Sequence, residues 1–188
     1  VKLNLGKIVT NTITKNTQMA VRKFFVDKGF LNTKVKITTI PDSARNNATM
    51  RVLVDKGQKV KIAKINFEGR SEVDESAIRM KMKGTKEKRF GRLFTPSKFV
   101  PKKFEEDKQK LIEYYNKLGY RDAVIESDTV IKHNDNTITI NMALNEGRKY
   151  YYRNIDFTGN YLYKSDRLRE VLGIAKGDVY NPEDLERS

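Results

Sequence analysis

The sequence lacks several features on which common protein functions depend. It contains no cysteine, which excludes disulfide bonds, thiolate catalysis and cysteine-rich zinc sites. Its single histidine, His133, lies in a polar stretch beside Asn and Asp residues, and one ligand does not make a metal site. Because cysteines are missing and the histidine stands alone, we expect no bound metal, and we also expect no cofactor. No run of 18 apolar residues is present, so the sequence predicts no transmembrane helix.

Residue sets typical of active sites are also missing. The sequence has no Ser/His/Asp or Cys/His set, no P-loop and no dinucleotide-binding fingerprint. Three consecutive acidic residues, Glu105, Glu106 and Asp107, have a simpler explanation than acid–base catalysis. We expect them in the first turn of a helix, where carboxylates complement the helix dipole. We therefore do not expect an enzyme.

The first residues do not resemble a secretion signal. The chain opens at Val1 without an initiator Met, and the stretch that follows has no apolar core. We interpret the sequence as an excerpt of a longer protein, in which localisation signals would lie elsewhere.

Positive charge is what the sequence has in excess. It contains 38 Lys and Arg residues against 24 Asp and Glu residues, a net charge of +14. This balance favours anionic partners such as nucleic acid, a membrane surface or an acidic protein. The alternative is that the basic residues only keep a modular protein soluble. A hydrophobic content of 38% fits several small units with much surface better than one large core.

An internal repeat organises the chain. The pattern of residues 104–159 recurs 90 positions earlier, without a gap, over more than fifty residues. The matching pairs are Gly119 with Gly29, Tyr120 with Phe30, Gly147 with Gly57, Ile155 with Ile65, Phe157 with Phe67 and Gly159 with Gly69. The sequence therefore predicts a repeat array with one unit of about 90 residues.

Each repeat combines helical and strand-like patterns. The first predicted helix covers 15–28, with Thr14 as N-cap and with Met19, Ala20, Phe24 and Val21 on the apolar side. Two more helices are predicted over 74–83 and over 104–118. Further helices should begin near Ser165 and at Asn181-Pro182. Strands are predicted over 33–40, 49–54, 60–67, 123–131, 137–145 and 150–157.

These elements follow the order strand, helix, helix, strand, strand. Residues 59–148 hold one complete repeat, residues 1–58 the second half of an earlier one, and residues 149–188 the first half of a later one. We call them the middle, first and last repeats. The fold class is α+β. Because a crossover between parallel strands is right-handed and the last two strands form a hairpin, we expect a mixed three-stranded sheet ordered second–third–first, with both helices on one face.

The repeat resembles a known family through four motifs. They are Leu118-Gly119-Tyr120, Leu144-Asn145-Glu146-Gly147, Ile155-Asp156-Phe157-Thr158-Gly159-Asn160 and Lys176-Gly177-Asp178-Val179-Tyr180. In this order and at this period they resemble the POTRA domain of outer-membrane assembly proteins, above all the periplasmic arm of BamA-type assembly factors of Gram-negative bacteria. Two features depart from the pattern: the loop 84–103 is long, and Lys56-Gly57 replaces the Glu-Gly pair in the first repeat.

The resemblance implies a function for the whole chain. It implies tandem POTRA-like βααββ units in the periplasmic part of an outer-membrane protein. Such a segment would act as a scaffold of the β-barrel assembly machinery, with unfolded outer-membrane proteins and accessory assembly subunits as partners. The POTRA fold also occurs in two-partner secretion transporters and division proteins, which remain alternatives. A basic nucleic-acid-binding repeat protein is a more remote one, because the sequence has no RNA-binding motif or zinc pattern.

The first candidate site is the edge strand of the middle repeat. In the expected sheet order one side of its backbone is unpaired, and a free edge can accept an extended peptide by β-augmentation. The stretch 33–40 would be its counterpart in the first repeat. The alternative is an edge protected by Glu126, Asp128 and Lys132. The candidate residues are Ala123, Val124, Ile125, Glu126, Ser127, Asp128, Thr129 and Val130.

The second candidate site is the basic loop 84–103. Its cations, mixed with Phe90, Phe94 and Phe99, are suited to anionic lipid head groups or an acidic partner. The alternative is a solvated loop whose phenylalanines pack onto its own repeat. Single-stranded nucleic acid is a remote third possibility, and no nucleic acid is expected. The basic residues are Lys86, Lys88, Arg89, Arg92, Lys98, Lys102 and Lys103.

Overall fold

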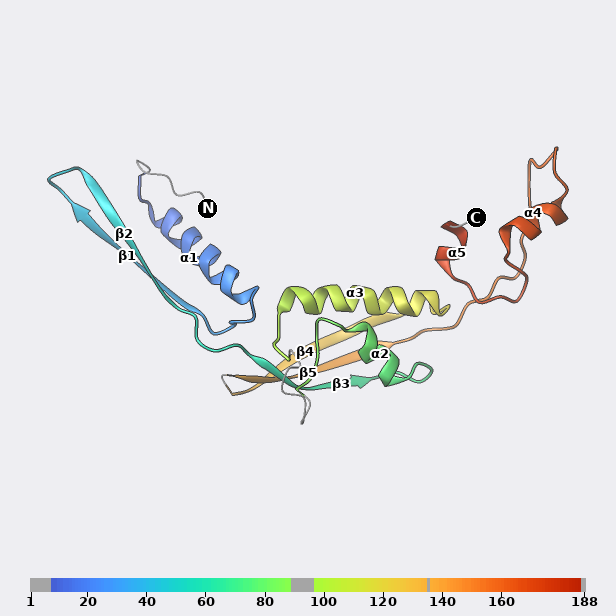
Figure 1. The fold of residues 1–188 in the computed structure, drawn as a ribbon, viewed down its shortest axis with the longest axis horizontal. Coiled ribbons are helices and arrows are strands. Elements are labelled where there is room, and N and C mark those ends of the chain that lie inside the picture. The colour runs from blue at the N-terminus through green and yellow to red at the C-terminus, as the bar shows by residue number, and fades with distance from the viewer. Residues whose placement is uncertain (1–7, 89–96, 135, 187–188) are drawn as a thin grey trace. The chain divides into compact units, whose positions relative to one another are not determined.

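The computed structural model describes residues 8–88, 97–134 and 136–186, which form two compact units (Figure 1). Unit 1 contains residues 1–64, 84–104 and 131–139, and unit 2 contains residues 65–83, 105–130 and 140–188. Among the described residues no helix is long and apolar enough to cross a membrane.

Unit 1 begins with helix α1, Asn11–Val26. Its N-cap is Thr10, whose Oγ1 accepts a hydrogen bond from the Ile13 N–H at 3.2 Å. The predicted cap Thr14 is wrong, because its own hydroxyl donates back to the Thr10 carbonyl inside the helix. The helix ends as predicted before Gly29, whose φ of +90° is the left-handed conformation of a helix C-terminus.

The inward side of α1 differs from the predicted one. Met19 and Phe24 are 69% and 54% exposed. The inward residues are four apart, and a buried Thr stands among them: Ile13, Thr17, Val21 and Phe25. The prediction was wrong because a polar residue occupies a core position, which shifts the apparent apolar stripe.

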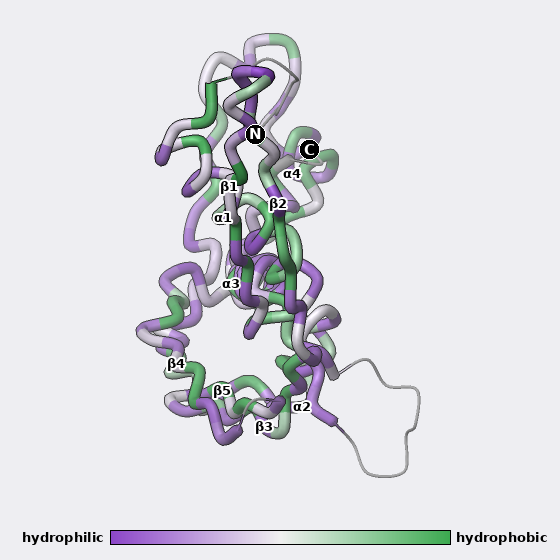
Figure 2. Tube along the Cα trace, turned by 90° about the vertical axis from the view of Figure 1, so that its left-hand side faces the viewer, coloured by the Kyte–Doolittle hydropathy of each residue, from purple (hydrophilic) through white to green (hydrophobic). Residues whose placement is uncertain are grey.

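Strands β1 (Lys34–Asp42) and β2 (Asn47–Asp55) form the predicted antiparallel hairpin. Both are longer than predicted, and Pro41 pairs with Ala48 inside the ladder. Hydrophilic and hydrophobic segments alternate along both strands (Figure 2). The buried Val35 marks the side that faces α1, since Gln18 of α1 donates to the Val35 carbonyl at 2.8 Å.

A three-stranded sheet contains β3 (Lys61–Glu68), β4 (Val124–Asn134) and β5 (Thr137–Asn145), in the order β3-β5-β4. This confirms the predicted order. Strands β3 and β5 run parallel to each other. The Lys61 N–H donates to the Asn136 carbonyl, and the Asn66 side-chain amide donates to the Asn141 side chain at 2.7 Å. Both contacts join residues 75 positions apart, as parallel strands require.

Helices α2 (Glu75–Lys81) and α3 (Pro101–Lys117) lie on one face of the sheet (Figure 1). The ammonium group of Lys81 in α2 lies over the Tyr114 ring of α3, 4.2 Å from the ring centroid. The predicted alternation of the central strand is confirmed, because every second residue is buried. The core comprises Ile78, Met82, Leu111, Tyr115, Ile138, Ile140, Met142 and Leu144.

Helix α3 begins three residues earlier than predicted, at Pro101. Proline suits the first helical position, because its missing N–H would have no partner there. No acidic residue therefore lies in the first turn, and the expected dipole role of Glu105, Glu106 and Asp107 is wrong. Asp107 is instead buried, 90 positions after the buried Thr17.

The last repeat contributes α4 (Ser165–Leu172) and α5 (Pro182–Glu186), whose predicted starts are confirmed. No strand forms over 150–157, contrary to the prediction. A strand needs a hydrogen-bonded neighbour along its length. In the described chain the backbone partners of this stretch gather at Tyr150, Tyr151 and Tyr152, around the isolated bridge between Tyr151 and Val179.

Backbone geometry repeats with the 90-residue period. The Phe30 N–H donates to the Phe25 carbonyl, and the Tyr120 N–H to the Tyr115 carbonyl, both at 3.0 Å. The repeat is thus visible in hydrogen bonds as well as in sequence. Its division into 1–58, 59–148 and 149–188 stays a prediction.

Candidate functional site

The outer side of β4 is the open edge of the three-stranded sheet. At the other edge, Ile62 of β3 is engaged by a loop: its N–H donates to the Ser97 carbonyl at 2.7 Å, and its carbonyl accepts from the Lys88 N–H at 2.9 Å. Within the described part of the chain, β4 has β5 as its only strand neighbour. The candidate edge is therefore available for main-chain pairing.

A groove runs between α3 and β4. It has a volume of about 450 Å³ and an apolar floor from Ile112 of α3 and Ile125 of β4. Four polar residues surround these two: Lys108, Gln109, Glu113 and Asp128. The helix residues of this groove were not among the predicted site residues. Their signal was available, because two helices packed on one face of the sheet must bring one of them beside the edge strand.

An ion pair spans the groove. The Lys108 ammonium group lies 2.7 Å from Asp128 Oδ2 and 2.8 Å from Glu105 Oε2. Partial burial alone would lower the pKa of Lys108, but the hydrogen bonds to Asp128 and Glu105 outweigh it and raise the pKa above its ordinary value. Lys108 is therefore charged, and it ties α3 to the edge strand.

Strand β4 changes face within the candidate site. Ile125 and Asp128 both line the groove, although three positions separate them and a regular strand alternates every two. Glu126 lies on the opposite face, where its Oε1 accepts a hydrogen bond from the Asn145 amide at 2.8 Å. From this change of face we infer one extra residue in the strand, a β-bulge between Glu126 and Asp128. It also explains the weak alternation of the sequence here.

Two of the three charged residues that could protect this edge are engaged on the two faces of the sheet, and the third, Lys132, donates to the Asn32 side chain at 3.4 Å. Asp128 bonds to Lys108 in the groove, and Glu126 bonds to Asn145 on the other face. Val124 and Val130 are 50% and 43% exposed. Ala123, a predicted site residue, is buried before the strand begins, and its N–H donates to the Tyr120 carbonyl. The exposed edge therefore runs from Val124 to Asn134.

The counterpart edge in the first repeat is different. Val35 of β1 occupies the position equivalent to Ile125, and its carbonyl already accepts the amide of Gln18. The residue equivalent to Gln18 is Lys108, which donates to the side chain of Asp128 in β4. A helix side chain thus occupies a main-chain acceptor of β1 in the first repeat.

The basic loop is described in part. Arg89, Arg92, Phe90 and Phe94 lie outside the described residues. Lys98 forms an isolated bridge with Lys61. Phe99 is buried and packs on Phe104 with ring centroids 5.8 Å apart. Two further predicted loop residues, Lys102 and Lys103, belong to the first turn of α3, whereas Lys86 and Lys88 precede the undescribed stretch. Contact of this loop with an anionic surface stays a prediction.

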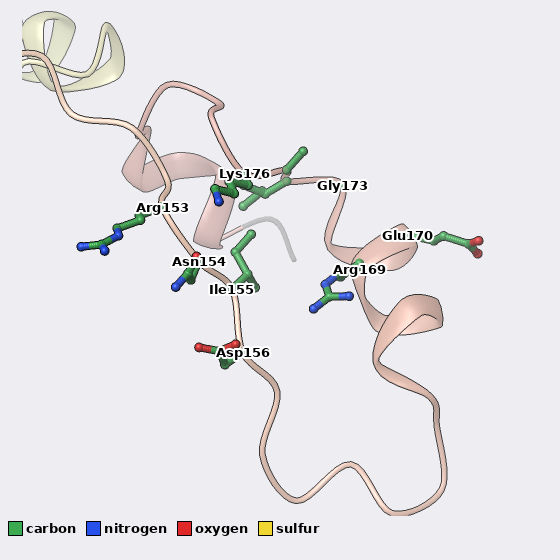
Figure 3. Close-up of a pocket in the computed structure, with 10 residues that line it drawn as sticks. Arg153, Asn154, Ile155, Asp156, Arg169, Glu170, Gly173 and Lys176 are labelled. Carbon is green, nitrogen blue, oxygen red and sulfur yellow. The ribbon is translucent and has the colours of Figure 1, made fainter.

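A second pocket lies in the last repeat. Its volume is about 610 Å³, and Figure 3 shows Ile155 between the chain at Arg153–Asp156 and the chain at Gly173–Lys176. The equivalent residue of the middle repeat, Ile65, is 2% exposed within the packed sheet. We interpret this pocket as an open part of an apolar interior. Among the described residues no group of three His, Cys, Asp or Glu side chains could hold a metal ion.

Glu146, part of a sequence motif, has a structural role near the site. It is 4% exposed, and it accepts hydrogen bonds from the Ser71, Glu72 and Val73 N–H groups, from the Ser71 hydroxyl and from the Tyr115 hydroxyl at 2.9 Å. Burial would raise its pKa, but these donors outweigh burial and lower the pKa. Glu146 thus fastens the loop after β3 to α3.

Comparisons with known proteins identify the family. The family model described as "Surface antigen variable number repeat", POTRA, matches residues 60–147 and 150–188. A putative outer membrane protein assembly factor of Treponema pallidum is 27% identical over 95% of this chain and 21% of its own length. The outer membrane protein assembly factor BamA of Buchnera aphidicola is 23% identical over 98% of this chain and 30% of its own.

A solved structure was also matched. The POTRA3-5 segment of Haemophilus influenzae BamA has a TM-score of 0.49 and 14% identity, over 96% of this chain and 68% of that one. The chain spans a fifth to a third of the length of the two curated relatives. Because the family model matches more than half of its residues, the chain belongs to the POTRA family, and it is a POTRA segment similar to those of BamA-type assembly factors.

Proposed function

We propose that this chain is a non-catalytic binding segment of the outer-membrane β-barrel assembly machinery. It would lie in the periplasm and hold unfolded outer-membrane proteins, with accessory subunits bound elsewhere on its surface. The names of the relatives favour this role over a two-partner secretion transporter or a division protein. The observation that carries the proposal is the open backbone edge of β4 beside an apolar groove.

The edge supplies affinity that depends little on sequence. An extended segment that adds to β4 exchanges main-chain hydrogen bonds with it, and every residue except proline offers the same donor and acceptor. A receptor for many different barrel precursors needs this property. The bulge near Ser127 interrupts the ladder, so it limits the registers in which an added strand can pair.

The groove supplies a preference for the pattern of barrel strands. Side chains of an added strand alternate between its two faces, and one set would point toward α3. That set would meet Ile112 and Ile125. Transmembrane barrel strands alternate apolar and polar residues, so one face of each strand suits the groove. Polar partners at the rim, including Lys108 and Asp128, would set the direction of the strand.

Alternately N-methylated peptides test main-chain pairing without changing the protein. A barrel-derived peptide is methylated on one alternate set of amides, or on the other, and titrated into isotope-labelled chain by NMR. The set that faces β4 should abolish the shifts at Val124–Asn134, whereas the other set should leave affinity within about threefold, less than one hydrogen bond is worth. Equal binding of both methylated peptides would contradict pairing at this edge.

A further inference from the structure

The net positive charge of the chain is concentrated in unit 1. Its residues include 22 Lys and Arg against 5 Asp and Glu, a net +17, whereas unit 2 has 16 against 19, a net −3. A field of this size attracts anions and repels cations of similar size. It is separate from the proposed peptide edge, most of which lies in unit 2.

Part of this charge lies on one face of the β1–β2 hairpin. The register fixes the face, because directly opposed residues share it: Lys34 with Asp55, Lys36 with Leu53, Thr38 with Arg51 and Ile40 with Thr49. The buried Val35 belongs to the opposite face, toward α1. We call the face with Lys34, Lys36, Arg51, Ile40 and Leu53 the basic hairpin face; the mixed hydropathy of both strands is visible in Figure 2.

The middle repeat is an internal control for this face. Ninety positions on, Lys36 becomes Glu126, Arg51 becomes Asn141 and Leu53 becomes Ala143. The middle repeat forms its hairpin without a single one of these residues. The fold therefore does not require Lys36, Arg51 or Leu53, and their presence on one face of the first repeat needs another explanation.

These side chains are available to a partner. Leu53 and Ile40 are 53% and 45% exposed. Lys34, Lys36 and Arg51 form no ion pair with any residue that the structure describes. The two acids on the face lie at its ends and accept backbone hydrogen bonds there: Asp55 from the Gly57 N–H, and Asp42 from the Ala44 and Arg45 N–H groups. Cations interleaved with exposed apolar side chains are typical of surfaces that contact a lipid bilayer.

We propose that the basic hairpin face binds an anionic phospholipid surface. Two strands of nine residues give a face about 30 Å long and 10 Å wide, or about 300 Å². A specific protein partner needs about 800 Å² on each side, so this face alone is too small for one. A bilayer needs no shaped pocket: its phosphates pair with the cations, and Leu53 and Ile40 enter the head-group region.

Vesicle flotation of the whole 188-residue chain tests the proposal. The chain should float with phosphatidylcholine vesicles that contain phosphatidylglycerol and stay behind with pure phosphatidylcholine. Each basic residue near such a surface raises the partition coefficient about fivefold, so the pair Lys36→Glu and Arg51→Asn should lower it at least about tenfold. Leu53→Ala should lower it further. Salt should weaken binding, because it screens exposed charges.

A matched variant separates this face from charge in general. Lys15→Glu with Arg22→Asn removes the same charge from the exposed side of α1 and should change partition less than about threefold, since it lies off the face. Equal losses in both variants, no loss in either, or equally tight binding to soluble polyglutamate would overturn the proposal. Peptide shifts at β4 should persist in both variants, so failure here is distinguishable from failure of the proposed function.

Discussion

At the scale of single residues, Glu146 shows how one side chain can hold a repeat together. Its carboxylate receives three backbone donors of one loop and the hydroxyl of a core tyrosine. In the first repeat Lys56 stands at the position of Glu146, and Phe25 stands at that of Tyr115. The acceptor and its hydroxyl donor are absent together, which fits their working as a pair.

Glu146→Gln should destabilise the chain strongly. Charge-assisted hydrogen bonds to a buried carboxylate contribute about 1.5–3 kcal/mol. In the variant, the NH2 group of the Gln side chain would also face N–H and O–H groups that now donate to Glu146. We expect a loss of about 3 kcal/mol in urea unfolding at pH 7. Glu72→Gln is the control, because that side chain is exposed in the same loop, and it should cost less than about 0.5 kcal/mol. Equal losses would contradict the role of Glu146.

The lowered pKa of Glu146 predicts that the free energy of unfolding depends on pH. The pKa of Glu146 is lower in the folded chain than in the unfolded one. Its contribution is therefore complete above the unfolded pKa of about 4.3 and is lost as pH falls through the lower, folded value. The stability of the unchanged chain should fall more steeply below about pH 4 than that of Glu146→Gln. Parallel pH profiles of urea midpoints would exclude this linkage.

At the scale of elements, the helix end at Gly119 carries two constraints. Its φ is +92°, and a Cβ there would meet Val179 Cγ1 at 2.5 Å and the Tyr150 carbonyl at 3.2 Å. The Gly119 carbonyl also accepts the Tyr150 N–H at 2.8 Å. The end of α3 thus contacts the start of the last repeat closely enough to exclude any side chain.

Gly119→Ala should therefore cost more than Gly173→Ala. Gly173 has a φ of +65°, but a Cβ there would meet nothing within 4 Å. The control carries conformational strain alone, about 1 kcal/mol, whereas Gly119→Ala adds overpacking of about 1–3 kcal/mol. Thermal unfolding measures both. Equal shifts in melting temperature would show that the contact at Gly119 is unimportant.

The elements also show what a sequence can predict. The glycines at 29 and 119 and the alternation of β5 identified helix ends and the central strand, because each depends on local chemistry. The inward side of α1 could not be identified, since Thr17 occupies a core position by packing alone. The sequence showed the face change at Ser127 only as weak alternation, and it indicated a helix beside the edge strand without its residues. The groove residues such as Ile112 depend on contacts between distant segments, so the fold was needed to name them.

At the scale of the whole molecule, the repeats share one plan and differ on their surfaces. Each repeat has a hairpin after its long helix, but one edge strand is engaged by Gln18 and the other is open. One outer face carries Lys36 and Arg51, and the other carries Glu126 and Asn141. Repetition of a POTRA fold can therefore supply several distinct binding surfaces from one architecture.

The central claim is that an extended client strand adds to β4. The chain has no cysteine, so single cysteines introduced at Thr129 of β4 and at the equivalent Thr39 of β1 can be cross-linked to a cysteine-bearing barrel peptide. Disulfide formation requires Cα atoms within about 7 Å, which only adjacent strands provide. We predict rapid cross-linking at position 129 and little at position 39. Equal yields at the two positions, or none at 129, would contradict the account.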